Sequence, residues 1–160
     1  MTFRTFARAA TAVVLLLLPS VVTAGVRDDR PNLVGGELGG RGVAFTLNYE
    51  RYLSSKFGLG VGLMAIKVSG AGVTILPLYA SYLPGNVHSP YFSVGTTMLA
   101  GGGDINDWES TWLIHASFGY QYSSPGGFFV RPFFTYLRPT EKGSGDDYLV
   151  WPGLTIGGSF

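Results

Sequence analysis

The chain has 160 residues, of which 46% are hydrophobic, 13% are charged and 24 are glycine, with no cysteine and a formal net charge of +1. The absence of cysteine excludes disulfide scaffolds, thiolate metal sites and cysteine nucleophiles. The charge balance is too neutral for a protein that must neutralise many nucleic-acid phosphates. The length fits one domain, and the abundance of glycine with few charges argues against both a soluble helical protein and a disordered one.

Residues 1–24 have the pattern of a secretory signal peptide. Arg4 and Arg8 give a positive start, and an apolar stretch follows from Ala9 to Val22. Val22-Thr23-Ala24 offers small residues before a cut, so we predict cleavage after Ala24 and one remaining domain, residues 25–160. The alternative is an uncleaved membrane anchor, but the stretch is shorter than a spanning helix and contains Pro19.

The rest of the chain alternates between apolar and small or polar residues, which is typical of β-strands. Val43, Phe45, Leu47 and Tyr49, for example, are separated by Ala44, Thr46, Asn48 and Glu50. No run of apolar residues is long enough for a transmembrane helix. Turn residues divide this part into about eight strands, which we place near residues 32–38, 41–53, 57–68, 73–83, 90–100, 111–122, 127–137 and 148–160.

The two faces of these strands predict a barrel that crosses a membrane. One face is too small and polar for a protein exterior and fits the inside of a narrow barrel: Gly58, Gly60, Gly62, Ser93, Gly95, Thr97, Ser117, Gly119, Thr155 and Gly157. The other face would contact lipid: Phe92, Val94, Met98, Phe118, Phe128, Val130, Phe134, Leu154 and Ile156. Short connections also alternate with longer polar ones. We therefore predict an all-β fold, an antiparallel up-and-down transmembrane β-barrel of about eight strands.

Aromatic residues gather toward the two ends of the predicted strands. One group falls near the rim that would face the periplasm: Tyr49, Tyr52, Phe57, Tyr82, Tyr91, Phe92, Tyr120, Tyr122, Phe128 and Phe160. The other rim would hold Trp112, Tyr136, Tyr148 and Trp151. Two belts of this kind are expected where tyrosine and tryptophan lie at the two membrane surfaces.

The last predicted strand, Tyr148 to Phe160, resembles the terminal signal by which bacterial outer-membrane proteins are presented to the barrel-assembly machinery. Apolar residues recur on alternate positions before Phe160, at Ile156, Leu154, Pro152 and Val150, and Gly158 departs from the pattern. Three further segments resemble the small outer-membrane β-barrel proteins of about eight strands: Leu47-Asn-Tyr-Glu-Arg-Tyr52, Ile75-Leu-Pro-Leu-Tyr79 and Phe128-Phe-Val-Arg-Pro-Phe133. The resemblance implies export to the outer membrane.

A barrel of about eight strands has an interior that its side chains just fill, so a general diffusion pore is not expected. Glu50 and Arg131 fall on inward positions near one rim, with Asn48 and Gln121 at similar depth. A charge in such an interior must be paired. We predict a structural network of these residues, and a proton or ion path is the alternative.

His115 and Ser117 share a strand face, which is an arrangement that a base and a hydroxyl nucleophile can use. Their spacing is similar to that of outer-membrane lipid A deacylases, in which an acidic residue completes the set. The alternation, however, places His115 and Ser117 in the interior, and no acidic residue occurs between Ser117 and Arg138. We therefore interpret His115 as a structural histidine and keep the catalytic pair as an alternative.

The segment from Gly101 to Glu109 groups Asp104, Asp107 and Glu109, and calcium takes oxygen ligands of this kind. The segment lacks the turn glycine of an EF-hand, so a metal site is only an alternative there. Trp108, between these carboxylates, is a candidate for contact with a partner or a membrane interface.

Together these patterns predict a monomeric outer-membrane protein without a cofactor. Its expected role is non-enzymatic, in envelope integrity, surface binding or adhesion through its outer loops. The expected partners are outer-membrane lipid, lipopolysaccharide and the barrel-assembly machinery, and not nucleic acid. Two alternatives stay open: an enzyme that modifies lipid A, and a secreted soluble β-barrel that binds a small apolar ligand.

Overall fold

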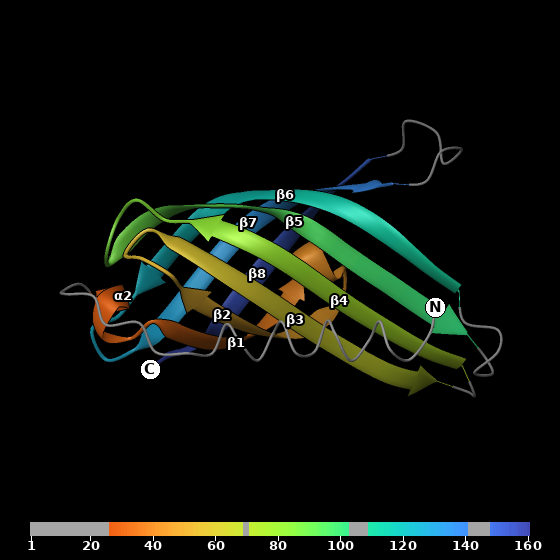
Figure 1. Cartoon of the computed structure of the whole chain (residues 1–160), viewed down its shortest axis with the longest axis horizontal. Coiled ribbons are helices and arrows are strands. Elements are labelled where there is room, and N and C mark those ends of the chain that lie inside the picture. The colour runs from red at the N-terminus through yellow and green to blue at the C-terminus, as the bar shows by residue number, and fades with distance from the viewer. Residues whose placement is uncertain (1–25, 69–70, 103–108, 141–147) are drawn as a thin grey trace.

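The computed structural model of the protein describes residues 26–68, 71–102, 109–140 and 148–160, so the predicted signal peptide lies outside the described residues. Eight strands form a closed barrel in which each strand is antiparallel to both neighbours (Figure 1). The strands are β1 (Asn32–Gly39), β2 (Phe45–Tyr52), β3 (Phe57–Val68), β4 (Ala71–Tyr82), β5 (His88–Gly102), β6 (Glu109–Ser123), β7 (Phe128–Pro139) and β8 (Leu149–Ser159). The predicted all-β up-and-down barrel is confirmed. No helix in the described ranges is long and apolar enough to cross a membrane.

Three short connections, residues 53–56, 83–87 and 124–127, lie at one end of the barrel, on the left in Figure 1. The short helix α2 (Val26–Asp29) lies at the same end. The barrel closes there between its first and last strands, since the backbone N–H of Asn32 donates to the carbonyl of Phe160 at 3.1 Å and the N–H of Phe160 donates back at 2.9 Å. We call this the short-turn end and the opposite one the outer end.

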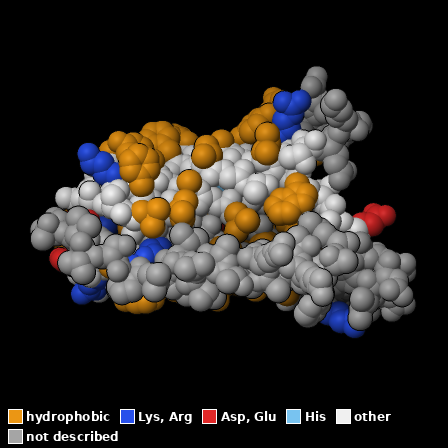
Figure 2. Space-filling view, in the orientation of Figure 1, with side chains coloured by type: hydrophobic (Ala, Val, Ile, Leu, Met, Phe, Trp, Pro, Cys, Tyr) orange, Lys and Arg blue, Asp and Glu red, His pale blue; other side chains and the backbone are white. Residues whose placement is uncertain are grey.

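Burial alternates along the strands as the sequence predicts. Every residue predicted to face inward is buried or half-buried. The outward residues include Phe118, 61% exposed, Val94, 62%, and Phe134, 60%. Figure 2 shows hydrophobic side chains along the side of the barrel, with most charged side chains toward its ends. A polar interior inside an apolar exterior is the reverse of a soluble barrel, which argues against the soluble alternative.

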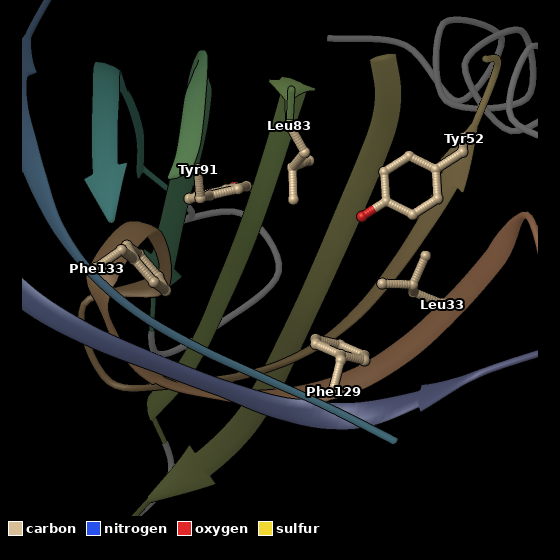
Figure 3. Packing of buried hydrophobic residues seen from close by; sticks show 6 residues of the cluster. All are labelled: Leu33, Tyr52, Leu83, Tyr91, Phe129 and Phe133. Atoms are coloured by element: carbon tan, nitrogen blue, oxygen red, sulfur yellow. The ribbon is translucent and has the colours of Figure 1, made fainter. Parts of the chain in front are cut away.

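Tyr52 and Tyr91 correct the predicted aromatic belt. Both lie near the short-turn end, but they are only 5% and 0% exposed because they stand on inward positions of their strands. They pack inside the barrel in a cluster with Leu33, Leu83, Phe129 and Phe133 (Figure 3). Their positions along the strands correctly predicted that they lie near this end of the barrel. Strand alternation, however, turns their side chains into the interior and not toward the membrane surface. Other members of the belt, such as Phe57, Tyr82 and Phe128, are exposed.

The connection between β1 and β2 corrects the predicted start of the second strand, residue 41. Gly40–Gly42 instead form a 3-10 turn, η1, whose three residues are all buried. Gly39 and Gly40 have φ angles of 68° and 60°, which favour glycine. Val43 has a φ of 62°, and a hydrogen bond of 2.6 Å from Ala44 N–H to the Gly42 carbonyl closes a γ-turn around it. The chain therefore folds back into the barrel, and β2 begins only at Phe45.

The N-terminal segment covers the short-turn end. The Arg27 guanidinium donates to the carbonyls of Ser55 at 3.1 Å, Leu83 at 2.9 Å and Asn86 at 3.1 Å, and so bridges two of the short connections. It also lies 5.3 Å from the ring centre of Tyr52, and Arg27 is 3% exposed. This arginine ties α2 to the barrel and blocks that entrance to the interior.

Candidate functional site in the barrel interior

Glu50 and Arg131 form an ion pair in the half of the interior nearer the short-turn end. Arg131 Nη1 donates to Glu50 Oε2 at 2.7 Å, although the residues are 81 positions apart. Arg131 Nε donates to Gln121 Oε1 at 2.7 Å, and the hydroxyls of Ser81 and Tyr79 donate to the Glu50 carboxylate. Both charges are therefore paired and hydrogen-bonded, as burial in a low-dielectric interior demands.

Glu37 and Arg41 form a second buried ion pair, nearer the outer end, and both residues are 0% exposed. The Glu37 carboxylate also accepts a hydrogen bond from the backbone N–H of Arg41 at 3.0 Å. The Asn48 amide donates to it at 3.2 Å and the Thr155 hydroxyl at 3.4 Å. Asn48 thus bonds to Glu37 rather than to Glu50, while Gln121 does lie beside Arg131.

Tyr79 and Tyr91 connect the two ion pairs. The Tyr79 hydroxyl donates to Glu50 at 3.3 Å, while its ring centre lies 3.7 Å from the Arg41 guanidinium carbon. The Tyr91 hydroxyl accepts from Arg41 Nη1 at 2.8 Å, and its ring centre lies 4.2 Å from the guanidinium carbon of Arg131. Each arginine therefore has a carboxylate partner and an aromatic face, and the interior holds one continuous network.

Glycines opposite the large side chains make room for this network. A Cβ on Gly60 would lie 2.1 Å from the Tyr79 ring, and one on Gly62 would lie 2.1 Å from Asn48 Oδ1. Gly153 has a similar role beside Phe133, at 2.5 Å. The small inward glycines seen in the sequence thus leave the space that tyrosine, phenylalanine and amide side chains of neighbouring strands occupy.

The network fills the interior. A cavity of about 10 Å³ remains beside Glu50, Tyr79 and Arg131, which is about the space that one water needs. Within the described chain, η1 obstructs the interior from the outer end and Arg27 obstructs it from the other. The arrangement is that of a plugged barrel and not of a solute channel.

His115 and Ser117 both face the interior, at 4% and 5% exposure. Ser117 Oγ lies 2.8 Å from Thr135 Oγ1, and the His115 ring makes no hydrogen bond with Ser117 or another side chain in the described part of the chain. The histidine ring packs over Gly95, where a Cβ would lie 2.9 Å from Cε1. The two residues thus share a face without forming a base–nucleophile pair, and a lipid outside the barrel would not reach them.

The predicted outer-loop residues are only partly described. Asp104, Asp107 and Trp108 lie outside the described residues, and Glu109 is exposed at the start of β6. Among the described residues, no group of three histidine, aspartate or glutamate side chains is placed to hold a metal ion.

The residues of the predicted assembly signal lie on the outward face of β8. Ile156 is 45% exposed and Phe160, just after the strand, is 62% exposed, while Leu154 is half-buried. Gly158, which departs from the pattern, lies on the same face and is exposed. Leu154 and Ile156 therefore stand next to each other on this face, and Gly158 separates them from Phe160.

Glu37, Arg41 and Arg27 are charged site residues that the sequence analysis missed, and it did not assign Tyr79, Ser81 or Tyr91 to the network either. Glu37 could have been found, because it continues the inward alternation of Leu33 and Gly35. Arg41 and Arg27 had no such signal, since both stand outside the strands and reach the interior through a turn and a short helix.

The closed barrel, its apolar exterior and its paired polar interior define a small transmembrane β-barrel of the kind found in outer membranes. Among solved structures, the crystal structure of Ail, the attachment invasion locus protein of Yersinia pestis, is similar to this chain with a TM-score of 0.48 and 14% sequence identity. The match covers 80% of this chain and 94% of Ail. No protein-family model matches the chain, and no curated protein matches it.

Proposed function

We propose that the protein resides in the bacterial outer membrane as a plugged, non-enzymatic barrel that holds its outer connections at the cell surface. The observation that carries this proposal is the reversal of polarity between exterior and interior. Large apolar side chains such as Phe118 and Phe134 are about 60% exposed, whereas the charged Glu37, Arg41 and Arg131 are at most 1% exposed. Such a molecule is stable where lipid replaces water around it.

The filled interior supports a role carried by the surface rather than by transport. The longest strands, β5 and β6, reach the outer end and carry one of the longer connections there. We assign to this end the expected functions in envelope integrity, surface binding or adhesion. Lipopolysaccharide and other outer-membrane lipids are the expected partners that surround the barrel. We also propose that the protein is a monomer and that Leu154, Ile156 and Phe160 are the signal recognised by the barrel-assembly machinery.

The experiment that tests the proposal compares two single substitutions in cells that export the protein. We expect the unaltered protein in the outer-membrane fraction, with different gel mobility before and after boiling. Phe118→Arg places a charge on the lipid face and is expected to reduce the inserted fraction, because such a charge costs about 2–4 kcal/mol at mid-membrane.

The matched control is Gly126→Arg, which adds the same side chain to an exposed turn at the short-turn end and should insert normally. Recovery of the unaltered protein as a soluble periplasmic species, or equal insertion of both variants, would contradict the proposed location.

A further inference from the structure

The outer rim of the barrel is lower on one side. β8 pairs with β1 only up to Gly153, and β3 pairs with β2 only up to Leu63, because the β1–β2 connection folds inward. Beyond these residues, residues 64–68 of β3 and 149–152 of β8 each have one edge without a strand partner in the described chain. We call the gap between these two edges, above the β1–β2 turn, the rim notch.

Apolar side chains stand on inward positions around the rim notch. Ile66 shares the strand face of buried Gly62, and Leu149 and Trp151 share that of buried Thr155. These three side chains are nevertheless 49%, 43% and 38% exposed, and Val73 on the inward face of β4 is 39% exposed. We call Ile66, Val73, Leu149 and Trp151 the outer cup. An adjoining open hollow of about 650 Å³ has a mixed lining that includes Val73, Leu99, Thr111, Ser110 and Glu109.

The floor of the outer cup is the inward-folded turn. A Cβ on Gly39 would lie 3.0 Å from the Trp151 indole nitrogen, so this ring covers the start of the turn. Below it the inward side chains are polar and paired, as in the Glu37–Arg41 pair. The cup is therefore an apolar layer that ends on a closed polar plug.

The apolar exterior continues into the outer cup through the rim notch. Leu38 and Phe45, on the outward face of the low wall, are 58% and 49% exposed. Leu63 and Val150 flank them on the neighbouring strands at 53% and 55%. These four side chains form an apolar surface that leads to Trp151 and Leu149 at the notch.

The upper end of the notch, at Leu149, lies at the edge of the hydrocarbon layer. Leu149 is ten positions from Ser159, which spans about 25 Å along the barrel axis at the usual rise and tilt of such strands. That distance is about the height of the apolar band of an outer-membrane barrel. Lys67 on the β3 edge is an exposed cation beside Ile66.

We propose that the outer cup binds one acyl chain of an outer-leaflet lipid, which enters laterally through the rim notch while Lys67 lies beside its anionic headgroup. This inference rests on the proposed membrane location. An acyl chain is the occupant that fits, because the cup is continuous with the lipid-facing surface and its polar floor stops the chain from passing further.

The test uses the purified protein inserted in phosphatidylcholine vesicles that contain phosphatidylglycerol with a diazirine group near the end of one acyl chain. After illumination, mass spectrometry maps the lipid adducts to individual residues. We expect adducts on Ile66, Leu149 or Trp151, in addition to outward residues such as Phe118. Adducts confined to outward residues of an inserted, heat-modifiable barrel would overturn the inference and leave the proposed location intact. Failure to insert would instead contradict the location.

Two neighbouring substitutions on β8 provide a matched pair. Leu149→Asn makes the cup polar and is expected to lower the adduct yield on Ile66 and Trp151 about tenfold. Val150→Asn alters the outward face of the same strand and should leave that yield unchanged. Equal yields in the two variants would show that the chain contacts the protein only from outside.

Discussion

At the scale of single residues, the interior is organised by charges that cannot be solvated. Arg131 and Glu50 are 1% and 2% exposed, and each has hydrogen-bond partners beyond the ion pair itself. Removing one member leaves the other buried without a countercharge, which costs more than the pair contributes. The contribution of such a pair to stability is therefore measured by comparing the free energies of unfolding of the single and double variants.

We predict that Glu50→Gln destabilises the folded barrel by about 3–5 kcal/mol, because it leaves the Arg131 charge unpaired. The double variant Glu50→Gln/Arg131→Met should be more stable than Glu50→Gln alone. The measurement is urea unfolding in lipid vesicles, followed by gel mobility without boiling. Arg131→Met alone completes the comparison. If the double variant lost the sum of the effects of Glu50→Gln and Arg131→Met, the two charges would not be coupled.

At the scale of elements, the β1–β2 turn shapes one entrance of the barrel. Glu37 holds the turn inside through the side chain of Arg41, through the Arg41 backbone N–H and through that of Gly42. Thr97 adds a hydrogen bond of 3.0 Å to the Arg41 carbonyl from the opposite wall. These contacts offset the unfavourable backbone at Val43, where a β-branched residue has a positive φ.

We predict that Val43→Gly raises the free energy of unfolding by about 1 kcal/mol, because glycine adopts a positive φ without the clash of a β-branched side chain. Ala44→Gly is the control, since Ala44 has no positive φ, and should lower the stability by about 0.5–1 kcal/mol. Urea unfolding of both variants tests this. A loss of stability in Val43→Gly would mean that the turn is not strained at Val43.

At the scale of the whole molecule, the barrel is closed in two senses. Its first and last strands pair over seven residue positions, so no sheet edge remains along that part of the wall. Its interior is occupied by the linked Glu50–Arg131 and Glu37–Arg41 pairs. The side chains of an eight-stranded barrel just fill its interior, which leaves no room for a general diffusion pore.

We predict that the protein in a planar lipid bilayer carries no steady ion current. The double variant Glu37→Gln/Arg41→Ala should also carry none, because Glu50, Arg131 and Arg27 still fill the interior toward the short-turn end. Stepwise currents from the unaltered protein would refute the plugged state.

The sequence by itself determined the architecture, the alternation of the two faces and most of the inward residues. These features are local: strand alternation has a period of two, so Phe118 and Ser117 can be assigned to opposite faces without knowing any other strand. The same local rule could have placed Glu37 in the interior.

Only the tertiary structure decided which interior groups meet. Glu50 and Arg131 are 81 positions apart, so their contact depends on the register of every strand between them and on closure of the barrel. Arg41 and Arg27 reach their partners from a turn and a short helix, where strand alternation does not apply. The rim notch likewise follows from the unequal lengths of paired strands. Each of these features is a relation between distant segments, and closing the barrel fixes all of them together.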